Sequence, residues 1–274
     1  MVPDSTFITN NKELDVVASR YQHAKELAID TESNGMYVYH EHVCLIQLGT
    51  QDGNYIIDPL QISNLEPLGF LLSNPHISKV IHGSDYDLRC LDRDYGFNIK
   101  SIFDTQLAAR FLGDTHPNLA SVLEINLGVS ISKSHHLQTS NWGLRPLSES
   151  AIDYAASDVN HLVQLAKVLK TSLSKLDRLS WVEEECKRLE TIKYIVPDSA
   201  EIAFLKVKGS NKLNPKGLAV LKELFSWRDS QAQIDDIPPS RIIPNDTIIR
   251  LAIIATEIRS SDQTTIKKII ADEV

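Results

Sequence analysis

The sequence predicts an α/β fold, with helices packed on a mixed β-sheet, followed by a smaller all-helical domain. Three short apolar runs, at residues 27–30, 43–49 and 54–58, lie close together near the start of the chain. Beyond them, short apolar runs alternate with longer segments of helical periodicity, which is typical of α/β proteins. From about residue 199 onward only helical patterns remain, so we expect a second domain there.

The first predicted elements are a helix and three strands. Residues 10–26 are expected to be helical because apolar side chains recur at helical spacing. The apolar run directly after them is the first strand. The next two runs, residues 43–49 and 54–58, flank Asp52-Gly53, a pair that favours a hairpin turn.

The middle of the chain alternates short strands with helices. Strands are predicted at residues 79–82 and 102–104, and a helix follows each of them. Asp104 and Thr105 can cap the second of these helices, at residues 106–111. The remaining helices of this part are predicted at residues 118–127, 148–176 and 179–192.

The composition changes near residues 194–198, and the predicted domains are therefore residues 1–193 and 194–274. Asn214 followed by Pro215 is typical of the start of a helix. Helices of the second domain are expected at residues 199–206, 214–234 and 244–258.

The bulk composition is that of a globular protein. Of 274 residues, 42% are apolar and 23% are charged. No apolar run approaches the roughly 20 residues that span a bilayer, and no secretory signal is visible, so we expect no membrane partner. The three cysteines are odd in number and far apart, which indicates reduced thiols and a cytoplasmic location.

The net charge of −8 is unfavourable for a nucleic-acid partner, but it is unevenly distributed. Residues 1–195 hold 17 Lys and Arg against 25 Asp and Glu, whereas residues 196–274 hold 11 of each class. The excess acid therefore lies in the larger predicted domain. Bound cations would offset it, so we expect modest, salt-sensitive binding of a polyanion.

Three segments supply acidic side chains at regular spacing. Asp30 and Glu32 end an apolar strand and lie two residues apart, so both point to one face of the sheet. Tyr154 and Asp158 are four residues apart on a predicted helix and also share a face. Residues 82–87 add acids directly after another apolar run. Acids that meet in one cleft repel each other unless cations lie between them, so we expect a site for hard divalent ions.

Seven segments, taken in order and spacing over roughly residues 5–190, resemble those of a known enzyme family. They are Ile29-Asp30-Thr31-Glu32, Leu45-Ile46-Gln47-Leu48, Ile57-Asp58-Pro59-Leu60, His82-Gly83-Ser84-Asp85-Tyr86-Asp87, Phe103-Asp104-Thr105-Gln106, Ser140-Asn141-Trp142-Gly143-Leu144-Arg145-Pro146-Leu147 and Asp153-Tyr154-Ala155-Ala156-Ser157-Asp158-Val159. The family is that of the four-carboxylate 3'→5' exonucleases of the DEDDy type, which include ribonuclease D. A lone Asp-x-Glu is common, whereas three ordered acidic motifs are specific.

A pattern between Leu221 and Leu251 resembles the HRDC module of ribonuclease D and RecQ-family helicases. It comprises Leu221, Trp227-Arg228-Asp229, Ala232, Pro238-Pro239-Ser240-Arg241-Ile242-Ile243-Pro244-Asn245 and Leu251. That module is a small helical bundle that assists nucleic-acid binding. There is room for one such module, and its last helix, near Ile270, is expected to be short.

The resemblance implies a ribonuclease H-like mixed sheet and a site for two divalent cations, Mg²⁺ or Mn²⁺. Asp30, Glu32 and Asp158 would hold the ion that carries the attacking water, and Asp30 with Asp87 the ion at the leaving 3' oxygen. Zinc would prefer nitrogen or sulfur ligands. Of the two acids in the second motif, the resemblance selects Asp87. Asp85 is then expected to cap the helix that begins there.

Tyr154 completes the catalytic set that the resemblance implies. A tyrosine hydroxyl with an ordinary pKa of about 10 is a poor base at neutral pH. A bound metal ion lowers the pKa of its own water. We therefore expect Tyr154 to orient the water by hydrogen bonding. A tyrosine on an amphipathic helix can also be a plain core residue.

Five further residues are candidates for substrate binding. Met36 or Tyr37, in the segment after the first motif, could stack on a terminal base. His82 could be a base or ligand, or a half-buried histidine packed beside the strand end, which we favour. Trp142 and Arg145 could contact a phosphate or brace the helix that follows, and we favour bracing.

A zinc site is an alternative for the segment after the first motif. His40, His42 and Cys44 alternate, so on a strand they would share a face. No fourth ligand lies at the usual spacing, and incomplete metal motifs are mostly coincidental.

The leading hypothesis is a monomeric 3'→5' exoribonuclease that acts on RNA with a free 3' end, such as tRNA precursors. The same chemistry on DNA is an alternative, since no motif here reads the 2'-hydroxyl. A non-catalytic RNA-binding scaffold is a third hypothesis. The complete set of acids and Tyr154 is unfavourable to it, because a binding protein has no need of all five.

Overall fold

The computed structural model describes residues 5–50, 53–131 and 134–257 in two compact units. The first unit comprises the described residues up to Asn34 together with His42–Tyr194. The second comprises Gly35–Glu41 together with the described residues from Ile195 onward. The sequence did not predict that a segment directly after the first acidic motif would belong to the second unit.

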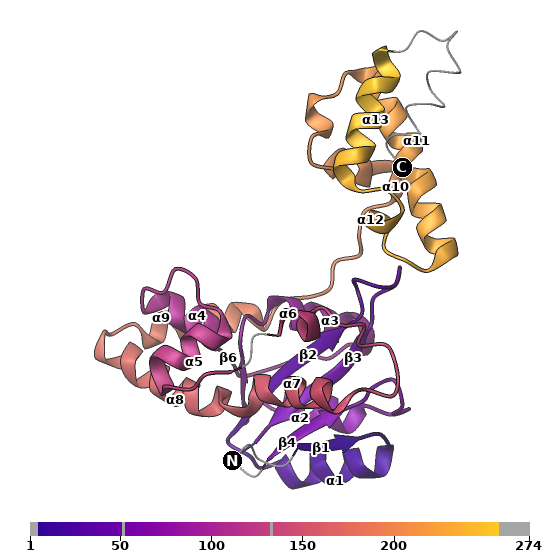
Figure 1. Cartoon of the computed structure of the whole chain (residues 1–274). Helices are drawn as coiled ribbons and strands as arrows, with labels where there is room; N and C mark the ends of the chain where they lie inside the picture. The colour runs from indigo at the N-terminus through magenta and orange to yellow at the C-terminus, as the bar shows by residue number, and fades with distance from the viewer. Residues whose placement is uncertain (1–4, 51–52, 132–133, 258–274) are drawn as a thin grey trace. The chain divides into compact units, whose positions relative to one another are not determined.

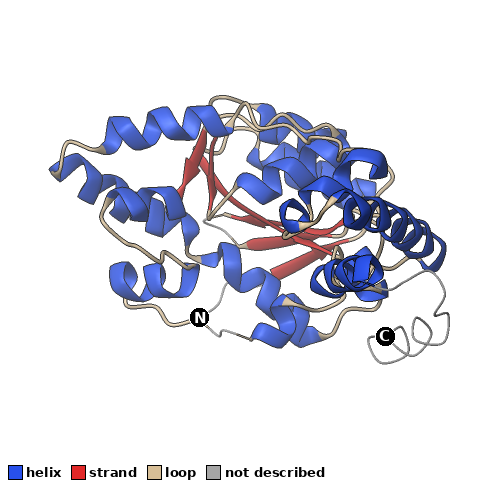
Figure 2. Ribbon diagram, turned by 90° about the horizontal axis from the view of Figure 1, so that it is seen from above, coloured by secondary structure: helices blue, strands red, loops and turns tan. Residues whose placement is uncertain are grey.

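The first unit is built on a mixed six-stranded sheet with the order β1-β4-β3-β2-β5-β6 (Figures 1 and 2). The central strand β2 is antiparallel to β3 and parallel to β5, and β3 is antiparallel to β4. The outer strands β1 and β6 pair in parallel with β4 and β5. The strands are β1 Ser5–Ile8, β2 Glu26–Ser33, β3 Val43–Gly49, β4 Asn54–Ile57, β5 Ser78–Ile81 and β6 Ile102–Asp104. The α/β prediction is confirmed.

Helices cover both faces of this sheet. The first face packs against α1, α2 and α3 around residues such as Leu14, Leu68 and Leu88. The second face packs against α4, α5, α7, α8 and α9. The helices of this unit are α1 Asn11–Tyr21, α2 Glu66–Ser73, α3 Asp85–Tyr95, α4 Thr105–Phe111, α5 Leu119–Leu127, α6 His135–Gln138, α7 Glu149–Asn160, α8 Leu162–Lys175 and α9 Leu179–Leu189.

The strand β2 alternates between the two cores. Leu27 and Ile29 point into the first core, whereas Ala28 belongs to the second. Asp30 and Glu32 continue the row of Ala28, because residues two apart on a strand share a face. The row therefore runs from an apolar core at the start of the strand to carboxylates at its end, on the side that α7 covers.

Helix α7 lies unusually close to the sheet at Gly49, the last residue of β3. A Cβ atom placed on Gly49 would be 2.6 Å from the carbonyl oxygen of Val159 on α7 and 3.0 Å from Cβ of Ala28. Real Cβ atoms do not approach a backbone atom so closely, so the contact requires glycine. This approach brings the helix that carries Tyr154 and Asp158 down onto β2 and β3.

The structure corrects several boundaries predicted from the sequence. The first helix ends at Tyr21, earlier than predicted, and the helix predicted over residues 148–176 is interrupted at His161. The edge strand β1 and helix α2, which has weak periodicity, were not predicted. Asp104 caps α4 as predicted, since its side chain accepts from the backbone N–H groups of Gln106 and Leu107. Asp52 of the predicted turn, like residue 258 and the helix expected near Ile270, lies outside the described residues.

The second unit is a small helical bundle. Its core includes Phe204, Leu221, Ile243, Ile248 and Ala252. The elements are α10 Ala200–Ala203, two 3₁₀ turns at Phe204–Lys206 and Ser210–Lys212, α11 Pro215–Asp235, α12 Pro239–Ile242 and α13 Asn245–Glu257. As predicted, the Asn214 side chain caps α11.

Within the second unit, the segment Gly35–Glu41 is bound to the bundle by polar and aromatic contacts. The Tyr39 hydroxyl donates to a carboxylate oxygen of Asp229 on α11 at 3.0 Å. The Arg241 guanidinium on α12 lies 4.7 Å from the ring centre of Tyr37, which is within the range of a cation–π contact. Met36, in the same segment, is 57% exposed.

Candidate active site

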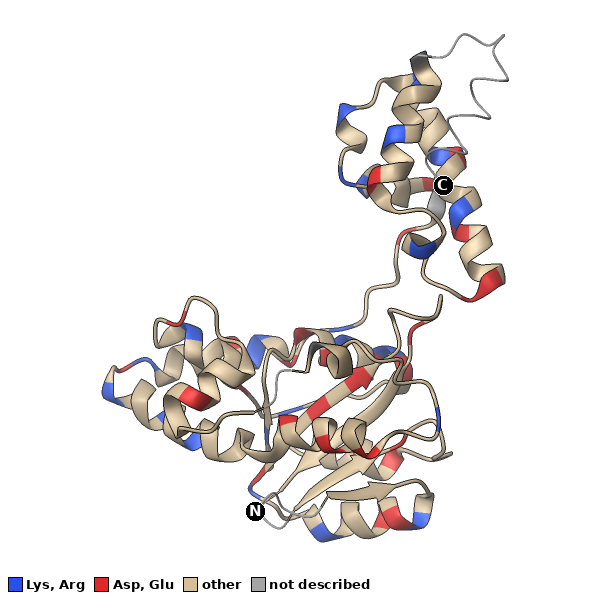
Figure 3. Cartoon of the chain, in the orientation of Figure 1, with Lys and Arg blue, Asp and Glu red and all other residues tan. Residues whose placement is uncertain are grey.

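Three of the predicted acids meet on the face of the sheet that α7 covers. Asp30 and Glu32 come from the end of β2, and Asp158 comes from α7. One carboxylate oxygen from each of the three lies within 4.8 Å of the others. Acidic residues are spread over the sheet and helices of this unit, as Figure 3 shows. In the described part of the chain, these three form the group with metal-binding spacing.

Asp87 lies near this group but outside it. It sits in the first turn of α3 and is 7% exposed. Its carboxylate accepts a hydrogen bond from the hydroxyl of Thr31, whose side chain points to the opposite face of β2 from Asp30 and Glu32. Its charge still raises the pKa of Asp30 and of Glu32. Asp87 therefore acts on the three acids through its charge, while its own side chain is turned toward Thr31.

Burial raises the pKa of all four acids, and repulsion by the other acids raises that of Asp30 and Glu32 further. Burial is the largest cause at each of them. The pKa of Glu32 rises to about 9, that of Asp158 to about 7 and that of Asp87 to about 6, and that of Asp30 lies well above its ordinary value.

The donor set fits hard divalent cations. No Lys or Arg among the described residues forms an ion pair with Asp30, Glu32 or Asp158. Buried carboxylates without a cationic partner favour protonation, and a divalent ion reverses that preference by stabilising the charged form. Oxygen donors alone are the ligands typical of Mg²⁺ and Mn²⁺ sites.

These pKa shifts predict that the metal-free protein loses stability as the pH rises from about 5 to about 9. The folded acids hold protons that the unfolded chain, with an acid pKa of about 4, has released. Unfolding therefore releases protons, and the free energy of unfolding falls through the pKa values of Asp87, Asp158 and Glu32. The lowered pKa of His82 acts in the opposite direction, only near and below its ordinary value.

Thermal unfolding in EDTA across this pH range measures the effect. Saturating Mg²⁺ should reduce the fall in Tm, because the ions bind the ionised acids. A Tm that rises steadily with pH in EDTA would contradict the prediction.

Tyr154 lies one helical turn before Asp158, on the same face of α7. Its ring lies 6.2 Å from that of Trp142, a fully buried residue. Burial raises the pKa of the Tyr154 hydroxyl, and the charges of Asp158, Glu32 and Asp30 raise it further. The phenol therefore keeps its proton at neutral pH and can orient a neighbouring oxygen by hydrogen bonding.

Arg145 braces the segment that leads into α7. Its guanidinium makes two contacts with the buried carboxylate of Asp58, at 2.6 and 2.8 Å. It also donates to the carbonyl oxygens of Trp142 and Cys44, at 2.6 and 2.9 Å. These contacts connect the segment to β3 and to the end of β4. They favour the bracing role over direct contact with a phosphate.

His82 is held by internal partners on both ring nitrogens. Nδ1 lies 2.9 Å from the Thr105 hydroxyl and Nε2 lies 3.0 Å from the Pro117 carbonyl oxygen. Burial lowers its pKa. This geometry favours the packing interpretation of His82 over a role as base or ligand.

The zinc alternative has no support in the described residues. His40 packs edge-on against Tyr39 in the second unit. The Cys44 thiol donates to the carbonyl oxygen of His42 at 3.4 Å, and no group of metal-binding spacing includes these side chains.

The turn before α3 depends on Asp104. One carboxylate oxygen accepts from the backbone N–H of Gly83 at 3.1 Å, and the other accepts from the N–H and the hydroxyl of Ser84, both at 2.8 Å. Gly83 has a φ of 76° there, which favours glycine. Ser84, and not Asp85, occupies the N-cap position. The predicted cap at Asp85 is wrong, and its exposed carboxylate instead pairs with Arg89 at 2.9 Å.

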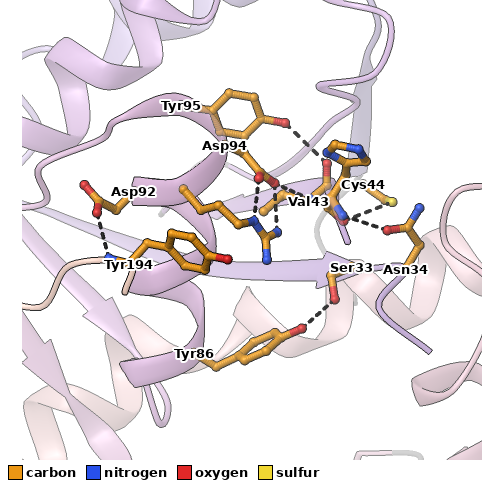
Figure 4. A network of polar contacts seen from close by, with 11 residues as sticks. Ser33, Asn34, Val43, Cys44, Tyr86, Asp92, Asp94, Tyr95 and Tyr194 are labelled. Carbon is orange, nitrogen blue, oxygen red and sulfur yellow. Dashed lines mark hydrogen bonds and ion pairs between the residues drawn. The ribbon is translucent and has the colours of Figure 1, made fainter. Parts of the chain in front are cut away.

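Contacts from α3 also hold the end of β2 and the start of β3, as Figure 4 shows. Asp94 accepts from the backbone N–H of Val43 at 2.7 Å, and the Tyr95 hydroxyl donates to the Val43 carbonyl at 3.3 Å. The hydroxyls of Ser33 and Tyr86 lie 2.8 Å apart. The pairing register of β2 and β3 shifts between Glu32 and Ser33. The helix that carries Asp87 thereby contacts both strands at this shift. No periodic pattern in the sequence indicated these contacts.

Two family models match the chain. One described as 3'-5' exonuclease matches residues 5–174, and one described as HRDC domain matches residues 217–256. Ribonuclease D of Gluconacetobacter diazotrophicus is 33% identical over 259 residues, a match that covers 92% of this chain and 64% of that protein.

Two solved structures show the same fold. The structure of Escherichia coli RNase D, described as an exoribonuclease involved in structured RNA processing, has a TM-score of 0.75 and 27% identity. The match covers 91% of this chain and 66% of that one. The catalytic core of RRP6 from Trypanosoma brucei has a TM-score of 0.82 and 27% identity, with coverage of 99% and 80%. This chain spans just under two thirds of the ribonuclease D sequences that it matches.

Proposed function

This chain belongs to the 3'-5' exonuclease family, and from that premise we propose that it shortens RNA from the 3' end and releases nucleoside 5'-monophosphates. The observation that carries the proposal is the grouping of Asp30, Glu32 and Asp158 within 4.8 Å, with no basic side chain among the described residues to neutralise them. A structural role for three half-buried acids this close together would cost stability without a compensating contact.

The residues fit two divalent cations, Mg²⁺ or Mn²⁺. Asp30, Glu32 and Asp158 would hold one ion, and Asp30 with Asp87 would hold the other. Bound ions would supply a water of lowered pKa and would stabilise the charge on the leaving 3' oxygen. Ligation by Asp87 would require its carboxylate to turn from Thr31 toward Asp30.

The protein's own groups prepare the site for this chemistry. Tyr154, with its raised pKa, stays protonated and holds the attacking water by hydrogen bonding. Trp142 packs against its ring and limits its movement. Arg145 and Asp58 fix the segment before α7, so the position of Tyr154 follows from the position of the sheet.

We propose RNA, and among RNAs the precursors of tRNA, as the substrate. The relation to ribonuclease D sequences supports RNA, and the HRDC match supports a nucleic-acid partner. We further propose a monomer with a cytoplasmic location. The location is supported by three buried cysteines, Cys44, Cys90 and Cys186, that form no disulfide within the described residues. In the part of the chain that the structure describes, no helix is both long and apolar enough to cross a bilayer.

A competition between two substrates tests the proposal. A 3'-extended tRNA and a single-stranded DNA that carries the same 3' extension are incubated with Mg²⁺, and products are separated by length. We expect stepwise loss of the RNA extension and nucleoside 5'-monophosphates as product. Faster loss of the DNA would support DNA as substrate. Binding of both without shortening would support the scaffold hypothesis.

A further inference from the structure

Gln47 is a buried amide whose hydrogen-bonding capacity is unused. It lies in the middle of β3 and has no exposed surface. Neither its side-chain nitrogen nor its side-chain oxygen has a hydrogen-bond partner in the described part of the chain. Buried polar groups in proteins are paired in the large majority of cases, so an amide with both atoms unpaired requires an explanation.

The register of the sheet places Gln47 beside the acids. Gln47 is directly opposite Asp30 in the antiparallel pair of β2 and β3. Residues opposite each other in such a pair project from the same face, with Cβ atoms roughly 5 Å apart. The Gln47 side chain therefore lies on the face covered by α7, next to the carboxylate that belongs to both proposed ion sites.

A second buried amide on the same face shows that α7 can satisfy such a group. Asn54 donates to the carbonyl oxygen of Ala156 at 3.2 Å and to the side-chain oxygen of Asn160 at 3.1 Å. Gln47 has no comparable contact with α7. On its own face its cross-strand neighbours are Asp30 and the apolar Ile56. Asp30 is thus the polar side chain that the strand register puts within its reach.

We propose that Gln47 is a positioning residue for the divalent-ion site and that its amide N–H donates to the ionised carboxylate of Asp30 when ions are bound. This role presupposes the nuclease function proposed above. A carboxylate that binds ions through some of its lone pairs retains others that need a donor, and residues behind a metal ligand commonly supply one. A neutral amide can do so without adding a charge to a site that already contains four acids.

The first measurement is metal binding, with MnCl₂ alone as the probe. We compare the wild-type protein with Gln47→Met, which keeps the length of the side chain and removes both polar atoms. Calorimetric titration should show Mn²⁺ affinity reduced by about 10- to 100-fold, the range typical of lost partners of metal ligands. The Tm in EDTA should be unchanged or higher, because an unpaired buried amide has been removed.

Lys79→Met is the matched control. Lys79 is also a fully buried polar residue on a strand of this sheet, but it pairs with Leu27 at the start of β2 and its ammonium donates to the Asn74 carbonyl. This variant is expected to change the Tm in EDTA and to leave the Mn²⁺ affinity within about twofold. Gln47→Leu provides a second apolar variant in case the methionine packs badly.

The outcomes separate this role from the proposed function. Unchanged Mn²⁺ affinity in both Gln47 variants, with a lower Tm in EDTA, would show a purely structural residue and overturn the inference while leaving the function intact. A wild-type protein that fails to bind Mn²⁺ would overturn both. If the role is correct, kcat for RNA falls with the Mn²⁺ affinity at fixed subsaturating metal, KM for RNA is unchanged, and high Mn²⁺ restores part of the loss.

Discussion

Replacement of Asp30 by Asn is expected to lower kcat for 3'-end shortening by about 10²- to 10³-fold, the scale on which removal of a single electrostatic contact to the reacting groups acts. Asp30 belongs to the three-acid group with Glu32 and Asp158, and the charge of Asp87 also raises its pKa. It is the one acid proposed for both ions, so its loss weakens both. Asn keeps the shape of the side chain but removes the charge and one acceptor oxygen.

The same substitution should not unfold the metal-free protein. Burial and repulsion already raise the pKa of Asp30, so a neutral side chain at this position removes an unfavourable charge. We expect the Tm of Asp30→Asn in EDTA to equal or exceed that of the wild type. Loss of activity together with a retained or raised Tm distinguishes a damaged site from a damaged fold.

Asp85→Asn is the matched control for this prediction. Asp85 belongs to the second acidic motif, but its side chain is 61% exposed and pairs with Arg89. Exposed ion pairs of this kind contribute little to stability, so kcat should stay within about twofold of the wild type. The measurement is the rate of release of a labelled 3' nucleotide in Mg²⁺. Activity of Asp30→Asn within about tenfold of the wild type would contradict the proposed site.

Replacement of Tyr154 by Phe is expected to lower kcat by about 10²-fold, the lower part of the range for positioned proton-handling groups. Phe keeps the ring that packs on Trp142, so the loss reports the hydroxyl alone. KM for RNA should change little, because the hydroxyl is proposed to contact the attacking water and not the substrate.

The pH profile separates orientation from base catalysis. The pKa of Tyr154 is raised by burial and by the acids around it, so ionisation of its hydroxyl cannot set the alkaline limb of the profile near neutral pH. Tyr154→Phe should therefore lower log kcat by the same amount from about pH 6 to about pH 9. Tyr55→Phe, which removes a hydroxyl bonded to Arg20 and Tyr21 at the far side of the unit, should leave kcat unchanged. A profile that changes shape in Tyr154→Phe would argue for proton transfer by the tyrosine.

Local spacing explains why much of the site could be predicted from the sequence. The i, i+2 relation of Asp30 and Glu32 and the i, i+4 relation of Tyr154 and Asp158 are properties of a strand and a helix, and both elements were recognisable from apolar periodicity. The hairpin of β3 and β4 followed from two apolar runs joined by a short polar segment. The resemblance then supplied the order of the motifs, which periodicity does not contain.

The parts that could not be predicted depend on contacts between distant segments. Periodicity shows which side of an element is buried, but not what lies against it. Three features depend on partners far away in the chain. They are the bond between Thr31 and Asp87, the bonds of Ser84 to Asp104 and the attachment of Gly35–Glu41 to the second unit. The edge strand β1 has four residues and pairs on one side only, which is too short for a clear alternation.

The backbone contact at Gly49 limits which substitutions this protein can accept at that position. Elsewhere in the two cores, a larger side chain at one position can be compensated by a smaller one at a neighbouring position. Such paired substitutions can accumulate one after another. The gap between Gly49 and the Val159 carbonyl holds no side chain that could shrink in compensation. In a library of random substitutions, we therefore expect almost no replacement of Gly49 to be tolerated, although Gly49 is not one of the three acids of the site. Functional variants with a change at position 49 are expected to carry a second substitution that moves the C-terminal turn of α7 away from the sheet.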